Sequence, residues 1–579
     1  MGHSTSFAFG DRQRGTGGIF WLAVAMLAGI AVLTGCNAKH EDPKPEPVKP
    51  PEVTYLDQGW SNDLRTRYYF DPQGSRLIPY DWFVALEQPD NDRLFIDVAH
   101  VEDLGYLPAA AGPLNPDGLP VGFVKDPAEN PETGHWMGLT CAACHTNDMM
   151  LAGKRVRIDG GPPMSDFETF MHQLEAAVTA TAADDAKFDR FAARVAPKDG
   201  AEALRDRLRD YQETLNALVE RNRTPHPYGA GRLDAFGYIL NAVAGAALDE
   251  PRNLRTPDAP VSYPFLWLTP KLEWVQWNGS AANPIGRNAG EVLGTFGTLE
   301  LVTTPDKMFS SSVLVDNLAE MEAWLNDLQP PAWPEPMLGA LDPVKVTAGS
   351  ALYQRDCMGC HNLPPYRMTA AKDNIAGKQF IKVTMIPYKK VGTDPKMIEN
   401  FGPRTAFTGP LANVLFGGNA QVPAGTYLGN VVAATVARDF RVRQIPEDKQ
   451  LAYSGYRYAP DGSPDTPKNI LAYKAGPLAG VWATAPYLHN GSVPTLADML
   501  KPPAERPAVF YVGNRTFDPV HVGYKNSEAE LSETERARAF RYDTSIPGNS
   551  NAGHNYPNPD RVVYTDNERL ALIEFLKSL

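Results

Sequence analysis

The sequence predicts a mainly α-helical fold in two domains, with long irregular loops and insertions. Its 579 residues exceed what one hydrophobic core usually organises, so more than one folded unit is expected. Fifty-two prolines and 48 glycines indicate long connections between short helices, and the alternation typical of strands is sparse. One short motif, Cys-x-x-Cys-His, occurs once in each half of the chain and supports a division into two.

The N-terminal segment, residues 1–36, has the pattern of an export signal. Its apolar run, Ile19–Leu33, follows two arginines and is too short to span a bilayer comfortably. The run leads into Leu-Thr-Gly-Cys, which resembles the lipobox of bacterial lipoproteins, and this implies acylation of Cys36. We therefore expect a periplasmic, lipid-anchored protein, and Asn37 after the cysteine favours the outer membrane by resemblance to enteric sorting rules. An uncleaved anchor helix is the alternative, and it also places the remainder outside the cytoplasm.

Proline-rich segments divide the rest of the chain. Residues 37–58 mix prolines with charges and cannot bury apolar surface, so they are expected to form an extended tether. A second break, QPPAWP at residues 329–334, separates an N-terminal domain, 59–329, from a C-terminal domain, 335–579. The folded part is expected to begin near residue 59.

Helices are expected at corresponding places in the two halves. Asp316–Leu328 closes the first half, Asp566–Leu579 closes the second, and Thr347–Arg355 leads into the second cysteine motif. Thr565 and Glu568 have the spacing of a capping box at the start of the last helix. One face of that helix is expected to carry the apolar residues Leu570, Ile573 and Leu576.

The two Cys-x-x-Cys-His motifs predict covalent haem attachment. Each places two thiols about one helical turn apart, where they can add to the porphyrin vinyl groups, and the adjacent histidine becomes the proximal iron ligand. The residues are Cys141, Cys144 and His145 in the first motif, and Cys357, Cys360 and His361 in the second. A thioredoxin-like redox pair or half of a zinc site is the alternative, but the histidines and the repetition favour haem. We therefore expect two covalently bound haem c groups in two cytochrome c-type domains.

Three segments resemble a known superfamily. From Tyr473 the chain reads YKAGPLAGVWATAPYLHNGSVPTL, which is similar to a segment of bacterial dihaem cytochrome c peroxidases and their methylamine-maturation relatives. Residues 277–281, WNGSA, resemble the peroxidase segment whose tryptophan lies between the two haems, which implies that Trp277 relays electrons. Residues 290–294, GEVLG, are similar to the stretch that carries the distal acid-base glutamate, which implies that Glu291 is catalytic.

The resemblance to the dihaem rubber oxygenases, a longer branch of this superfamily, is closer and covers nearly all of residues 59–579. It is carried by QGSRLIPYDWF, VQWNGSAANPIGRNAGE and GNSNAGHNY. In that branch the C-terminal haem has two histidine ligands and the N-terminal haem binds dioxygen. The resemblance implies that His554 is the sixth ligand of the C-terminal haem, with His489 as the alternative.

Two features depart from the peroxidase pattern. No histidine follows His145 at the short spacing where resting peroxidases place a removable distal ligand, and the interval from Trp277 to Glu291 is shorter. The rubber oxygenases have a phenylalanine in this region, and Val292 with Phe296 allows an apolar pocket here as well.

These residues are compatible with three functions. The first is a peroxidase-like oxidoreductase that reduces hydrogen peroxide at the N-terminal haem, with electrons delivered through the C-terminal haem and Trp277 and a proton moved by Glu291. The alternatives are a dioxygenase that binds dioxygen and cleaves an apolar substrate, and a non-catalytic dihaem electron carrier. A small periplasmic cytochrome or cupredoxin is the expected electron donor. The net charge of −13 is spread along the chain and argues against nucleic acid as a partner.

Overall fold

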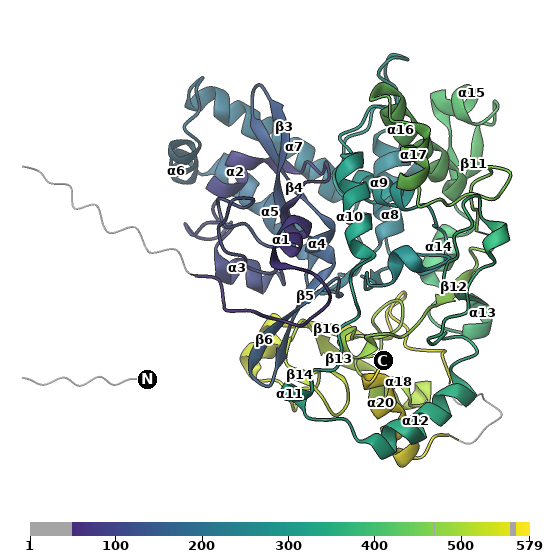
Figure 1. The fold of residues 1–579 in the computed structure, drawn as a ribbon. Helices are drawn as coiled ribbons and strands as arrows, with labels where there is room; N and C mark the ends of the chain where they lie inside the picture. Colours follow the sequence, from purple (N-terminus) through teal and green to yellow (C-terminus); the bar gives the residue numbers. More distant parts are fainter. Residues whose placement is uncertain (1–48, 468, 556–562) are drawn as a thin grey trace, which may run out of the picture. The chain divides into compact units, whose positions relative to one another are not determined.

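The structure is a computed structural model that describes residues 49–467, 469–555 and 563–579 (Figure 1). These residues belong to one compact unit. The predicted export signal and Cys36 lie outside the described residues. Within the described ranges, no helix is both long enough and apolar enough to cross a membrane.

Two small sheets flank the first cysteine motif. In one, β1 pairs parallel with β6, which pairs antiparallel with β5, and in the other the order is β2-β4-β3. The strands are β1 (Thr54–Tyr55), β2 (Ile78–Pro79), β3 (Phe123–Asn130), β4 (Gly134–Leu139), β5 (Thr146–Leu151) and β6 (Lys154–Asp159). The motif lies between the end of β4 and the start of β5. These sheets were not expected from the sequence.

Helices cover this N-terminal part. They are α1 (Asn62–Phe70), α2 (Tyr80–Ala85), α3 (Val98–Asp103), α4 (Cys141–Cys144), α5 (Phe167–Ala183), α6 (Asp185–Val195) and α7 (Ala201–Arg221). The apolar core beneath them is rich in aromatic rings, and Phe123 and Phe170 pack edge to face with centroids 5.5 Å apart.

A second apolar core joins segments from both sides of residues 329–334. It contains α9 and α10 from the first half and α16 from the second. The elements around it are α8 (Ala235–Leu240), a π-helix (Asn241–Ala246), α9 (Pro284–Gly294), α10 (Val315–Leu325), α14 (Lys396–Phe401), β10 (Thr405–Phe407), α15 (Ala412–Leu415), β11 (Gln421–Pro423), α16 (Ala424–Val442) and α17 (Glu447–Tyr453). The division of the chain into domains near residue 330 stays a prediction.

The C-terminal part places the second motif after α12. Its helices are α11 (Glu335–Leu338), α12 (Pro343–Asp356), α13 (Tyr388–Val391), α18 (Leu496–Met499), α19 (Glu533–Arg538) and α20 (Asp566–Lys577). Its strand pairs are β9 (Thr384–Pro387) with β12 (Ala472–Ala475), β13 (Val509–Val512) with β16 (Phe540–Asp543), and β14 (Phe517–Asp518) with β15 (Gly523–Tyr524). A further pair, β7 (Arg232–Leu233) with β8 (Val261–Ser262), lies in the first half of the chain.

The contact of α12 with α20 confirms the predicted closing helix and corrects one detail. Thr565 and Glu568 form the predicted capping box. A Cβ on Gly349 would lie 2.0 Å from the carbonyl oxygen of Ala571, so glycine is needed for the helices to approach this closely. Leu570, however, is 43% exposed, so its placement on the buried face was wrong.

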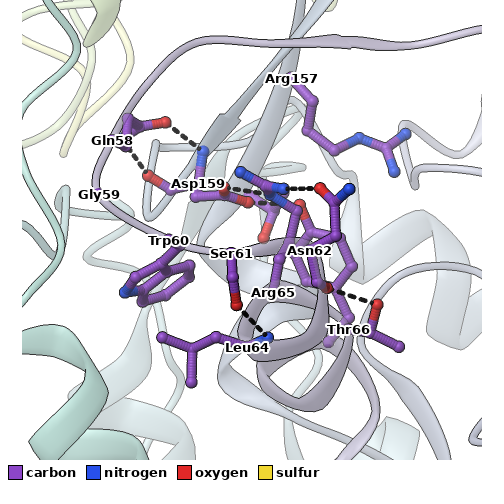
Figure 2. A network of polar contacts seen from close by, with 12 residues as sticks. Gln58, Gly59, Trp60, Ser61, Asn62, Leu64, Arg65, Thr66, Arg157 and Asp159 are labelled. Carbon is purple, nitrogen blue, oxygen red and sulfur yellow. Dashed lines mark hydrogen bonds and ion pairs between the residues drawn. The ribbon is translucent and has the colours of Figure 1, made fainter.

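A buried polar network connects residues 58–69 to β6 (Figure 2). Arg65 Nε donates to Asp159 Oδ2 at 2.6 Å, and the Tyr69 hydroxyl donates to Oδ1 of the same carboxylate. The Gln58 side chain bonds both the backbone N–H and the carbonyl of Asp159, each at 2.9 Å. Together with β1, this contact places the start of the folded region before residue 59, earlier than expected.

Replacing Asp159 by alanine is expected to lower the free energy of unfolding by about 3–5 kcal/mol, because Arg65 would stay buried without a counter-charge. Urea unfolding of the haem-loaded protein measures the change. Asp185→Ala is the control, since Asp185 pairs with Arg205 at 2.8 Å at the surface and its removal should alter stability by less than about 1 kcal/mol. Equal losses in both variants would contradict the expectation.

Candidate functional site

The first motif is a single helical turn enclosed by protein. Thr140 caps it by accepting a hydrogen bond from the Ala142 N–H, and Gln73 accepts from the Cys141 N–H at 3.2 Å. Ala142 and Ala143, between the two cysteines, are 1% and 4% exposed. A Cβ on Gly122 would lie 2.1 Å from the Ala143 nitrogen, so the chain before β3 packs directly on the turn. The two thiols therefore share one turn whose middle is buried, while Cys141 and Cys144 themselves are partly exposed.

His145 is held in the orientation that an iron ligand requires. Its Nδ1 donates to the Pro264 carbonyl at 2.8 Å, so Nδ1 carries the proton and Nε2 keeps its lone pair. Burial lowers the pKa of His145 to about 4. The ring is therefore neutral near pH 7, as metal binding demands.

The second motif repeats this arrangement in a more open setting. His361 Nδ1 donates to the Gly476 carbonyl at 2.8 Å, and the Tyr353 hydroxyl donates to the His361 carbonyl at 3.0 Å. Met358, between Cys357 and Cys360, is 46% exposed. The residues between the cysteines are thus buried in the first motif and exposed in the second, whereas all four cysteines are partly exposed.

The ring of His554, and not that of His489, faces His361. The centroids of the His361 and His554 rings are 6.1 Å apart. Imidazole nitrogens bind metal ions at about 2 Å, so two ligands on opposite sides of one metal have ring centres about 6 Å apart. His489 instead packs on Tyr473, with centroids 4.1 Å apart, and lies 6.5 Å from the Trp277 ring.

The loop that carries His554 is pinned by one arginine. Arg506 donates to the carbonyl groups of Asn551, Gly553 and His554, at 2.6, 2.9 and 3.0 Å. The His554 N–H donates to the Val391 carbonyl at 2.9 Å, at the end of α13. Desolvation and the neighbouring His361 lower the pKa of His554 to about 3, so this ring is also neutral near pH 7.

Trp277 lies on a hydrogen-bonded path that joins His145 and His361, the histidines of the two motifs. The four bonds of this path are His145 Nδ1 to Pro264 O (2.8 Å), Trp277 Nε1 to Ser262 O (2.9 Å), Lys474 N to Trp277 O (2.8 Å) and His361 Nδ1 to Gly476 O (2.8 Å). Two backbone segments of three residues each, 262–264 and 474–476, connect these bonds. The path is therefore continuous from one motif to the other.

Glu291, on α9, lies close enough to the first motif to influence its thiols. Burial raises the pKa of Cys141 to about 12, and the Glu291 charge adds to this shift. Gln276 Nε2 donates to the Glu291 carboxylate at 2.9 Å, and Arg287 lies 4.0 Å away. Although 44% of the Glu291 side chain is accessible, desolvation raises the pKa of its carboxyl, and Arg287 and Gln276 oppose the rise.

Several polar groups around the motifs fit a bound haem. The Tyr68 and Tyr106 hydroxyls are buried and have no hydrogen-bond partner among the described residues. Desolvation and the nearby thiols, Cys141 for Tyr68 and Cys144 for Tyr106, raise the pKa of each. Buried hydroxyls without partners are unfavourable, so these residues leave donors for a bound group to satisfy.

Lys474 adds a cation to this donor set. No carboxylate of the described residues pairs with its ammonium group, and desolvation together with Arg287 lowers its pKa to about 8. A haem carries carboxylate substituents that would supply the missing counter-charge. The two proximal histidines, the paired thiols and this cation therefore fit haem c.

Sequence patterns did not reveal all of these residues. Gln276, Lys474, Arg506 and the two tyrosines were missed. The spacing of Arg287 one helical turn before Glu291 was the only available signal for a partner of the carboxylate. Among the other histidines, His135 bonds the Asp126 carbonyl at 3.0 Å and His521 pairs with Asp518 at 2.6 Å, so both have structural partners.

The haem-attachment turns and their carbonyl-bound histidines are the site of a cytochrome c-type protein. Residues 472–511, which include β12 and His489, match the family model described as RoxA-like, cytochrome c-like. This match supports the binding of haem c and a function as an oxidoreductase. It also supports a relationship to the rubber-oxygenase-like cytochromes c.

Two proteins of Sinorhizobium fredii are similar to this chain. Uncharacterized protein y4iJ is 34% identical over 590 residues, which cover 92% of this chain and 94% of y4iJ. The chain belongs to the same family as y4iJ. Uncharacterized protein y4iM is 26% identical over 294 residues, which cover 50% of this chain and 56% of y4iM.

Proposed function

We propose that this protein is a periplasmic dihaem c-type oxidoreductase of the dihaem peroxidase superfamily, which reduces hydrogen peroxide at the first motif with electrons that enter at the second. The observation that carries the proposal is the hydrogen-bonded path through Trp277 between His145 and His361. Such a path is expected where electrons pass between two centres. A structural role alone would not require both ends of one path to be proximal histidines.

The different exposure of the residues between the cysteines supports this direction of electron flow. The residues between the two cysteines are buried in the first motif, which fits a site for a small oxidant. At the second motif Met358 is exposed, and Met368 and Ile375 of the following loop are 40% and 42% exposed. A small cytochrome or cupredoxin is the electron donor that we propose for this surface.

Each protein group has a defined task in this proposal. Bound haem supplies the redox centre, and peroxide takes up two electrons and two protons to give two waters. Glu291 holds and transfers a proton beside the first motif, as general acid-base catalysis requires. Gln276 and Arg287 orient its carboxylate. His554 would be a second histidine ligand for a haem at the second motif, and this ligand would keep oxidants away from that haem.

Loss of one haem is the direct test of the two attachment sites. Wild-type protein is expected to retain two covalent haems after denaturation, because each motif forms two thioether bonds. The double variant Cys141→Ser, Cys144→Ser should retain one haem and lose peroxide turnover, with the spectrum of the other haem unchanged. Mass spectrometry of the denatured chains counts the haems. A wild-type mass with fewer than two would refute the dihaem assignment.

We also propose a lipid anchor at Cys36, which would hold the enzyme at the periplasmic face of the outer membrane. Cys36→Ser is expected to abolish acylation and to release the protein from the membrane fraction or leave its signal uncleaved, because one acylated cysteine provides the attachment. Fractionation and N-terminal mass analysis measure this. A soluble wild-type protein whose N-terminus lies beyond residue 37 would contradict it.

A dioxygenase that cleaves an apolar substrate is the second candidate. The RoxA-like match favours it, as do the buried Val292 and the half-buried Phe296, which stacks on Phe167 with centroids 6.0 Å apart. Steady-state consumption of hydrogen peroxide and of dioxygen by the purified protein distinguishes the two. Dioxygen uptake without peroxide turnover would overturn the peroxidase proposal.

A further inference from the structure

A polar cleft of about 490 Å³ opens between α8, the segment 255–258 and α14. The cysteine motifs contribute no residue to its lining. Its size suits a small organic molecule. The charged and aromatic residues that line the cleft indicate which class of molecule it binds.

Two guanidinium groups in the cleft lack a carboxylate partner among the described residues. Arg404 Nη2 donates to the Asn253 carbonyl at 2.8 Å, and Arg255 Nη1 donates to the Leu254 carbonyl at 2.7 Å. Burial lowers the pKa of Arg404 to about 10; Asp234 opposes this shift and Arg255 adds to it. The two cations are therefore close enough to repel each other, and neither has an ion-pair partner.

Most of the carboxylates that line the cleft already have hydrogen-bond or ion-pair partners. Both oxygens of Asp234 accept backbone N–H groups, from Gly237 at 2.8 Å and Ala259 at 3.0 Å. Asp258 pairs with Lys396 at 2.9 Å. Glu399 is the remaining lining carboxylate, and it is exposed at the edge. The three cations of the lining, Arg255, Arg404 and Lys396, balance its three carboxylates, Asp234, Asp258 and Glu399, and the two arginines are the cations without an ion pair among the described residues.

Aromatic rings form another part of the lining. The Phe236 and Phe401 rings stack with centroids 4.3 Å apart and an interplanar angle of 28°. Guanidinium groups bind carboxylates through paired hydrogen bonds, and ring faces favour flat apolar bodies. We propose that this cleft binds a small aromatic carboxylate, with its anionic group at Arg255 and Arg404 and its ring against Phe236 and Phe401.

The cleft also adjoins the electron path. Phe236 and Met397 line the cleft, and both belong to the apolar cluster that includes Trp277 and Tyr473. The lining of the cleft and Trp277 therefore belong to one apolar cluster. The binding proposal stands independently of the reaction that the motifs perform.

Calorimetric titration of the haem-loaded, full-length protein with benzoate tests the proposal at low ionic strength. Wild-type protein should bind benzoate, and Arg255→Gln should weaken binding about tenfold or more, since it removes one of the two cations. Glu399→Gln should tighten binding several-fold, because it removes a nearby like charge. Arg255 and Glu399 are both exposed, so their replacement leaves the fold intact.

A control variant and two control ligands distinguish the possible outcomes. Arg538→Gln, at a surface arginine outside the cleft, should bind benzoate as the wild type does. Benzylamine, a cation of similar shape, should not bind, and inorganic phosphate should bind more weakly than benzoate. No benzoate binding at millimolar concentrations, or benzylamine binding that Glu399→Gln abolishes, would overturn the proposal. Phosphate binding as tight as that of benzoate would overturn the assignment of the ring site.

Discussion

Replacing Glu291 by glutamine is expected to lower the turnover number for hydrogen peroxide by about 10² to 10⁴-fold, the usual contribution of a positioned acid-base group. Glutamine has the same size, so Gln276 can still donate to the side chain at position 291. The absorption spectra of both haems should therefore stay unchanged. Stopped-flow and steady-state assays with peroxide measure the effect.

The pH profile gives a second readout of the same group. Desolvation raises the pKa of Glu291, so its proton-accepting form is lost at a higher pH than for an ordinary carboxyl. Turnover should fall as the pH decreases through this raised pKa, and the fall should be absent in Glu291→Gln. Glu300→Gln, at an exposed position after α9, is the matched control and should behave as the wild type. An unchanged peroxide rate in Glu291→Gln would favour the dioxygenase.

Local patterns in the sequence predicted the parts of the site that are contiguous in the chain. Each Cys-x-x-Cys-His motif needs one helical turn, and the capping box of α20 needs four residues. Local patterns could not predict which face of α20 is buried, because the burial of that face depends on contact with α12. Leu570 has the same apolar character as Leu572, and only the partner helix separates them.

The connection between the motifs was beyond sequence reasoning for a different reason. Its acceptors are the backbone carbonyl groups of Ser262, Pro264, Trp277 and Gly476, which any residue type would provide. The sheets around the first motif were missed because β5 is buried on both faces and shows no alternation. Trp277 was found only by resemblance, and its role as an electron relay stays a prediction.

Replacing His554 by alanine is expected to open the second haem to added ligands. In resting wild-type protein, cyanide should change only about half of the haem absorbance. The structure places the His554 ring opposite His361, whereas no histidine ring and no hydrogen bond from the described residues reaches Nε2 of His145. His554→Ala removes that ring, so cyanide should then change the whole haem signal. Titration followed by absorbance and electron paramagnetic resonance measures the stoichiometry.

His489→Gln separates the two candidate ligands. His489 packs on Tyr473 and Trp277 instead of His361, so its replacement should leave the cyanide stoichiometry at half, even if it slows electron transfer along the adjoining path. Full cyanide binding in His489→Gln, with half binding in His554→Ala, would reverse the assignment. Two haems that both resist cyanide in the resting wild type would instead support the electron carrier, because neither iron would then offer a position at which an oxidant can bind.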